Sequence, residues 1–116
     1  KIKPDLVFLT GDFVNFSDEE YDLISNNVSQ IRSSLGNFGC LGNHDHFMPE
    51  KSTHKLTQKI EASNVKMLNN QNTVLTINGQ KLQIAGIDNT GYGQHFGDFN
   101  KANKNIARGP TFVTRV

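Results

Sequence analysis

Two short apolar runs, each closed by a glycine and followed at once by polar side chains, most constrain the fold of this chain. The first run covers residues 6–10 and leads into Gly11-Asp12, and the second ends at Leu41 and leads into Gly42-Asn43-His44-Asp45. A continuous apolar run is typical of a strand that is covered on both faces. Because ligands collect beyond the carboxyl ends of strands in open α/β sheets, the two runs predict two walls of one site.

Helices are expected after each of these strands. Apolar residues at helical spacing predict a helix over 18–35, with Gly36 just beyond its end. Ser52 or Thr53 is suited to start a second helix that extends to Ala62.

Asn78-Gly79, between alternating runs at 73–77 and 81–87, predicts a β-hairpin with a type I′ turn. The remaining elements are expected to be short, namely strands at 37–41 and 65–68, a polar helix at 99–107 and a strand from Thr111. This order of elements predicts an α/β fold with a mixed sheet.

Composition excludes several classes of protein. The 116 residues suit one small domain, and 12 basic against 11 acidic side chains give a formal net charge of +1. Since there is no basic stripe or acidic tail, charge implies neither nucleic acid nor a membrane surface as partner. The lone Cys40 excludes an internal disulfide and a cysteine-based zinc cluster. The chain opens with Lys and stops inside a strand pattern, so we expect both ends to be cut from a longer domain.

The residue types at the two strand ends suit a dinuclear metal site. The carboxylate of Asp12 has two oxygens and can bridge two divalent cations, whereas Asn43 offers a neutral oxygen. Such oxygen ligands, together with imidazole, suit Mn²⁺, Fe or Zn²⁺. His44 need not bind a metal, and with Asp45 to orient it, it could donate a proton to a leaving oxygen.

These blocks carry a family resemblance. Gly-Asp-Phe-Val-Asn at 11–15 and Gly-Asn-His-Asp at 42–45 resemble the second and third sequence blocks of the calcineurin-like metallophosphoesterases. The sequence at 42–47, with Ala-Gly-Ile-Asp at 85–88, is similar to the bacterial branch that acts on lipid-linked or sugar-nucleotide diphosphates. The family's first block, Asp-x-His, a later His and the terminal Gly-His-x-His do not occur in the chain. The resemblance therefore implies a partial αββα sandwich truncated at both ends, with residues 1–116 as the central part of one domain.

By position, the resemblance also implies roles for individual residues. Asp12 would bridge two divalent metal ions (Mn, Fe or Zn), and Asn43 would bind one of them. His44 would be the acid, Asp45 would hold His44, and Asn15 would lie behind the metal ligands. A hydroxide shared by the two metals would then attack phosphorus.

The implied activity is metal-dependent hydrolysis of a phosphodiester or pyrophosphate, with manganese as one candidate metal. The substrate would be a small-molecule or lipid-linked phosphoester, and no nucleic-acid partner is implied. Because two ligand blocks are missing, we expect the full-length parent to be the hydrolase and this piece to be inactive alone. Membrane association stays open, as does localisation in the cytoplasm or at the periphery of a membrane.

The other histidines and the phenylalanines carry weaker signals. His46 is a candidate substrate contact, against the simpler interpretation of a surface histidine beside the site. We expect His54 and His95 to be exposed to solvent. Four phenylalanines near the two blocks are expected to belong to the core, namely Phe13, Phe16, Phe38 and Phe47.

Two other functions stay open. The missing blocks leave room for a non-catalytic binding module of the same fold. The glycine-rich stretch at 91–97 resembles a dinucleotide loop and would suit a nucleotide-binding α/β module, although Phe96 stands where that pattern needs glycine.

Overall fold

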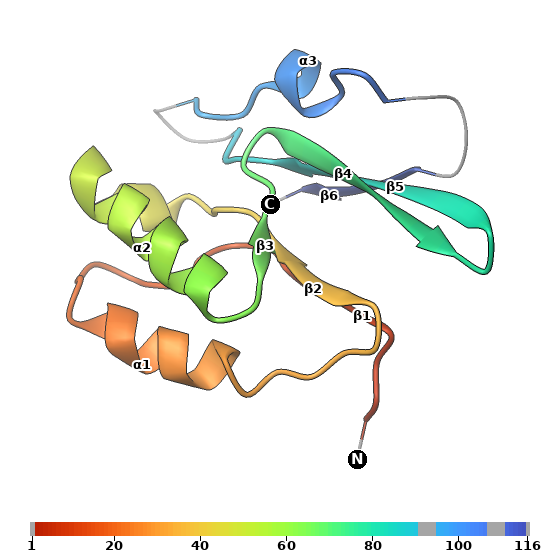
Figure 1. Ribbon diagram of the computed structural model, residues 1–116. Coiled ribbons are helices and arrows are strands. Elements are labelled where there is room, and N and C mark those ends of the chain that lie inside the picture. The colour runs from red at the N-terminus through yellow and green to blue at the C-terminus, as the bar shows by residue number, and fades with distance from the viewer. Residues whose placement is uncertain (1, 91–94, 107–110, 116) are drawn as a thin grey trace.

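The computed structural model describes residues 2–90, 95–106 and 111–115, which contain two three-stranded sheets (Figure 1). The first sheet is parallel, in the order β1-β2-β3, and consists of β1 (Leu6–Leu9), β2 (Gly36–Gly39) and β3 (Lys66–Met67). The second sheet is mixed, with β4 (Gln71–Ile77) antiparallel and β6 (Thr111–Arg115) parallel to the central β5 (Gln80–Ile87).

The helices cover the outer faces of the two sheets. In Figure 1, α1 (Glu20–Val28) and α2 (Glu50–Ala62) lie against the parallel sheet, and the short α3 (Phe99–Ala102) lies over β4 and β5. A 3₁₀ turn, η1 (His44–His46), follows β2. The order of layers is therefore helix, sheet, sheet, helix, which confirms the predicted α/β fold as part of an αββα sandwich.

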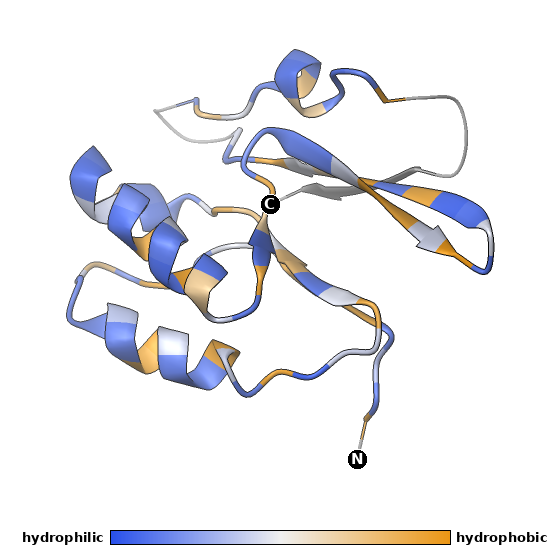
Figure 2. Ribbon diagram, viewed as in Figure 1, coloured by the Kyte–Doolittle hydropathy of each residue, from blue (hydrophilic) through white to orange (hydrophobic). Residues whose placement is uncertain are grey.

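Two apolar clusters hold these layers together. One packs the helices on the parallel sheet and includes Tyr21, Leu56 and Ile60. The other lies between the sheets, where Phe38 of β2 meets Ile84 of β5. Figure 2 shows α1 and α2 as largely hydrophilic ribbons with separate hydrophobic bands, as helices with one buried face require.

The hairpin forms as predicted. Ile77 pairs with Gln80, and both residues of the turn have positive φ, 50° at Asn78 and 79° at Gly79. A type I′ turn requires this conformation at both positions, and Asn and Gly adopt it at low cost. The strand from Thr111 is also confirmed, as β6.

The predicted helix over 18–35 was wrong in its second half, since α1 ends at Val28. Beyond it, the Ser29 hydroxyl donates to the carbonyl of Asn26 at 2.7 Å, and Arg32 Nη1 donates to the carbonyl of Ser29 at 2.6 Å. These side chains take up carbonyls that a longer helix would need. The Leu35 amide already donates to the carbonyl of Asp5 at 2.8 Å, at the entrance to the parallel sheet.

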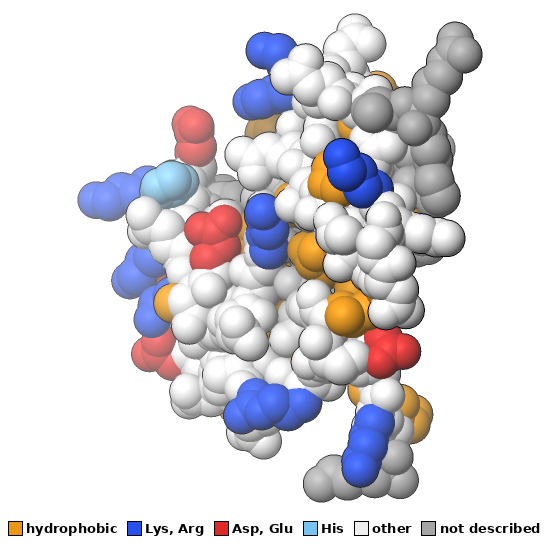
Figure 3. All heavy atoms as spheres, turned by 45° about the vertical axis from the view of Figure 1, so that its right-hand side comes forward, with side chains coloured by type: hydrophobic (Ala, Val, Ile, Leu, Met, Phe, Trp, Pro, Cys, Tyr) orange, Lys and Arg blue, Asp and Glu red, His pale blue; other side chains and the backbone are white. Residues whose placement is uncertain are grey.

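Two other helices differ from their predicted bounds. The helix α2 begins at Glu50, directly after Pro49, and not at Ser52 or Thr53. The helix α3 ends at Ala102 and does not extend to 107. Within the described residues, no helix combines the length and the apolar character that crossing a bilayer requires. Figure 3 shows basic and acidic side chains scattered over one face of the molecule, without a basic stripe on that face.

Candidate active site

The loops that follow β1 and β2 meet backbone to backbone. Gly11 has φ 93°, and a Cβ atom there would come closer than 3.0 Å to the backbone of Gly42. A Cβ atom at Gly42 would in turn come closer than 3.0 Å to the carboxylate of Asp12. Only glycine allows this approach, which brings the two predicted polar segments together at one edge of the parallel sheet.

Asp12 and Asn43 supply oxygen donors at this edge. Asp12 is exposed, has φ 53°, and accepts the backbone N–H of His44 through Oδ1 at 3.0 Å. Its carboxylate therefore lies beside the peptide that joins Asn43 to His44. Oδ2 of Asp12 and the side-chain amide of Asn43 make no hydrogen bond to any described residue, so both remain available to a cation.

His44 is held by a partner other than the predicted one. Its Nδ1 lies 2.7 Å from Oδ1 of Asn15, and the ring packs near Phe16 and Phe47. With the amide oxygen of Asn15 as acceptor, Nδ1 carries a proton and Nε2 is the atom left for a substrate.

The structure corrects the prediction that Asp45 orients His44. Asp45 is fully buried, and its oxygens accept the backbone N–H groups of Val14 at 3.1 Å and Gly42 at 2.8 Å. Burial raises the pKa of this carboxyl, and the hydrogen bonds from Gly42 and Val14 act in the opposite direction. Because Val14 and Gly42 belong to different loops, Asp45 joins the two walls of the site instead of contacting the imidazole.

His46 has a different partner from His44, namely Asp88. Its Nε2 lies 2.6 Å from Oδ1 of Asp88, and its ring stacks on Phe96 with centroids 3.7 Å apart and planes 7° apart. Only 11% of the His46 side chain and 8% of the Asp88 side chain are exposed. His46 is thus not an open surface histidine, and it joins η1 to the end of β5.

Asp88 is the residue to which sequence reasoning gave no role. It follows the apolar end of β5 as Asp12 follows β1, and this repeated pattern is the signal that could have indicated it. Asn70 stabilises the same corner, since its Oδ1 accepts the backbone N–H of Asp88 at 3.2 Å and that of Asp98 at 2.8 Å.

The four phenylalanines do not form one core cluster. Phe38 is buried and Phe13 packs against the core, as predicted. Phe16 and Phe47 are instead 63% and 54% exposed, and they stack on each other with centroids 5.4 Å apart. The prediction was wrong for these two, because the loops that carry them project beyond the sheet edge.

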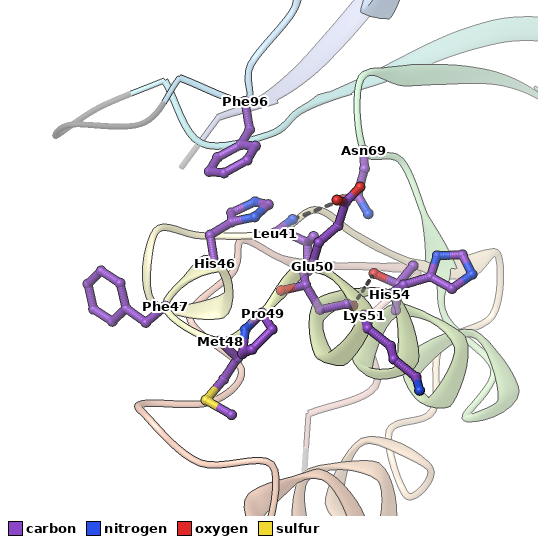
Figure 4. Close-up of a pocket in the computed structure, with 12 residues that line it drawn as sticks. Leu41, His46, Phe47, Met48, Pro49, Glu50, Lys51, His54, Asn69 and Phe96 are labelled. Carbon is purple, nitrogen blue, oxygen red and sulfur yellow. Dashed lines mark hydrogen bonds between the residues drawn. The ribbon is translucent and has the colours of Figure 1, made fainter.

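An open cavity of about 1080 Å³ lies beside the site, bounded by η1, the first half of α2 and Phe96. Figure 4 shows His46 under Phe96, with Phe47 pointing out on the other side of η1. His54 and His95 are exposed, as expected. The proposed dinucleotide loop at 91–97 lies partly outside the described residues, since 91–94 are not among them.

Comparison with known proteins adds to this geometry. The sequence model of the family described as calcineurin-like phosphoesterase matches residues 1–109. The chain is 28% identical over 93 residues to phosphodiesterase YaeI of Escherichia coli K12, a match that covers 79% of this chain and 34% of YaeI. It is 26% identical over 87 residues to a Caenorhabditis elegans protein named "Putative metallophosphoesterase F40B5.2", covering 75% of this chain and 18% of that protein. The chain thus spans about a third or less of the length of these relatives.

Proposed function

The chain belongs to the calcineurin-like phosphoesterase family, and from this premise we propose that residues 1–116 are the central part of a metal-dependent phosphodiesterase domain. Family membership supports phosphoester hydrolysis with divalent metal ions. The narrower choice of a phosphodiester draws on the name of the relative YaeI. A lipid-linked substrate, with membrane association as its consequence, is a more specific form of the same proposal.

One observation carries the proposal, namely the hydrogen bond of 3.0 Å from the His44 backbone N–H to Asp12 Oδ1. It brings a carboxylate, an amide and an imidazole from two strand ends to one place. Asp12 and Asn43 would hold two divalent metal ions there. When bound, such ions activate water and neutralise charge on the phosphoryl oxygens.

The residues of this chain have three further roles, namely orienting the imidazole, donating a proton and holding the two loops together. Asn15 keeps the His44 ring oriented with Nε2 toward the substrate, and His44 in its protonated form donates from Nε2 to the leaving oxygen. Asp45 fixes the spacing of the two loops through its bonds to Val14 and Gly42.

A metal pair needs more protein ligands than Asp12 and Asn43 supply. Within 2–90, 95–106 and 111–115, no group of three or more His, Cys, Asp or Glu side chains could hold a metal ion. We therefore propose that the other ligands come from further parts of the full-length protein, and that residues 1–116 alone do not turn over substrate.

The test uses the full-length protein with Mn²⁺ and bis(p-nitrophenyl) phosphate. Asp12→Asn and His44→Asn should each lower kcat/KM by about 100-fold or more, since the first weakens the hold on the metal ions and the second removes the acid. The exposed Asp22→Asn and His54→Asn are matched controls that should keep full activity. Unchanged turnover in both site variants would overturn the proposal, and Mn²⁺ binding without any turnover would favour a non-catalytic binding module.

A further inference from the structure

Two exposed aromatic rings stand beside the proposed acid. Phe16 comes from the loop after β1 and Phe47 directly follows η1, yet their planes are within 6° of parallel. More than half of each side chain faces water. Two rings that stack in the open leave apolar surface on which another group can pack.

Both rings also contact the imidazole of His44. The ring centroid of His44 lies 4.8 Å from that of Phe47 and 5.6 Å from that of Phe16. Since Asn15 occupies Nδ1, the leaving oxygen would approach Nε2. The organic group attached to that oxygen then lies within reach of the two phenyl rings.

The position of the rings favours a substrate group as their occupant. Both lie against the imidazole of His44, whose Nε2 would face the leaving oxygen. A parallel pair of phenyl rings offers a flat apolar face, on which a planar group stacks well.

We propose that Phe16 and Phe47 form a stacking surface that selects phosphodiesters with a planar aromatic leaving group. This specificity role rests on the proposed function, because it takes His44 as the group that faces the leaving oxygen. The two rings would bind the leaving group equally well in the ground state and in the transition state. Its loss should therefore raise KM and leave kcat nearly unchanged.

The experiment compares the full-length protein with Phe16→Leu, Phe47→Leu and the double variant, in Mn²⁺. Leucine keeps an apolar side chain and removes the flat ring. Each single variant should raise KM for methyl p-nitrophenyl phosphate about two- to tenfold, given the usual strength of aromatic pairs. Phe99→Leu is the matched control and should leave KM unchanged, since Phe99 lies on α3 and is 47% exposed.

Calorimetry without divalent metal ions supplies a second readout that involves no turnover. The wild-type protein should bind methyl phenyl phosphate more tightly than methyl cyclohexyl phosphate, and the double variant should lose this preference. Equal affinity of the wild type for both compounds, or an unchanged KM in the double variant, would overturn the inference. So would binding of the wild type to phosphatidylcholine–phosphatidylglycerol vesicles that the double variant loses, since this would assign the rings to a lipid surface.

The two proposals fail in different ways. If Asp12→Asn abolishes turnover while the phenylalanine variants change neither KM nor affinity, only the stacking surface is wrong. If no phosphodiester is hydrolysed at all, the proposed function fails, and the calorimetric preference still decides whether the rings bind an aromatic group.

Discussion

The β4-β5 hairpin and the pair of loops after β1 and β2 are held together by different kinds of contact. The hairpin turn is specified by two adjacent residues, Asn78-Gly79, whose positive φ values need no distant partner. The strand-end loops are fixed by hydrogen bonds between residues about thirty positions apart, from Val14 to Asp45 and from His44 to Asp12. Local turn chemistry could therefore be predicted closely, whereas the assignment of partners within the site could not.

Glycine substitutions should show the largest difference in stability between the two regions. Gly42→Ala places a Cβ atom against the backbone and carboxylate of Asp12, so the loops must separate. We expect the free energy of unfolding to fall by about 3 kcal/mol or more and activity to be lost. Gly79→Ala meets no atom within 4 Å and suffers only the strain of φ 79°, about 1 kcal/mol. Urea unfolding of the two full-length variants measures the difference, and equal losses would show that the loop approach is not tight.

Asp45→Asn should have the next largest effect. The amide keeps the shape of the carboxylate but has only one acceptor oxygen, so one of the N–H groups of Val14 and Gly42 loses its partner. A buried donor without a partner costs about 1–3 kcal/mol. Relief from burying a charge offsets part of this cost.

The matched control is Asp98→Asn, since Asp98 is exposed and accepts one N–H, that of Lys101 at 2.9 Å, as the cap of α3. Asparagine caps helices as well as aspartate does, so its unfolding midpoint in urea should not move. Equal shifts in the two variants would contradict the view that Asp45 joins the loops.

These contrasts show how far the sequence could specify the structure. The strand ends and the hairpin follow from periodicity, glycine positions and turn residues, each of which acts over a few positions, whereas the layer order was implied only by the family resemblance. The partner of His44 could not be found in this way, because Asp45 is adjacent in sequence and yet points into the protein, while Asn15 lies 29 positions away. The exposure of Phe16 and Phe47 was missed for the same reason, since it depends on where two loops project.

Asn15→Ala should lower activity without a measurable change in stability. The hydrogen bond from His44 is exposed, so its loss should leave the unfolding midpoint nearly unchanged. The ring would then rotate away from the leaving oxygen, and kcat should fall about tenfold, part of what a positioned acid contributes. Asn15→Asp keeps an acceptor oxygen and should restore most of the rate, whereas Asn26→Ala on α1 should change nothing. A stable Asn15→Ala variant with full kcat would show that His44 needs no such support.

The smallest effect is expected at a contact that is distant in sequence but exposed. Lys59 Nζ on α2 donates to Asp22 Oδ1 on α1 at 2.5 Å, and 82% of the Asp22 side chain faces solvent.

This bond, with the charge of Lys59, lowers the pKa of Asp22. A lowered carboxyl pKa means that the ion pair stabilises the fold above the ordinary pKa of aspartate, and that this contribution is lost as pH falls through the lowered value. Because solvent screens the pair, Asp22→Asn should not measurably shift the urea midpoint at pH 7. The exposed Lys59–Asp22 pair and the buried contact between Asp45 and Val14 both join residues that are distant in sequence. If Asp22→Asn leaves stability unchanged, burial explains why the Asp45 contact is stronger. A clear loss of stability at pH 7 would contradict this explanation.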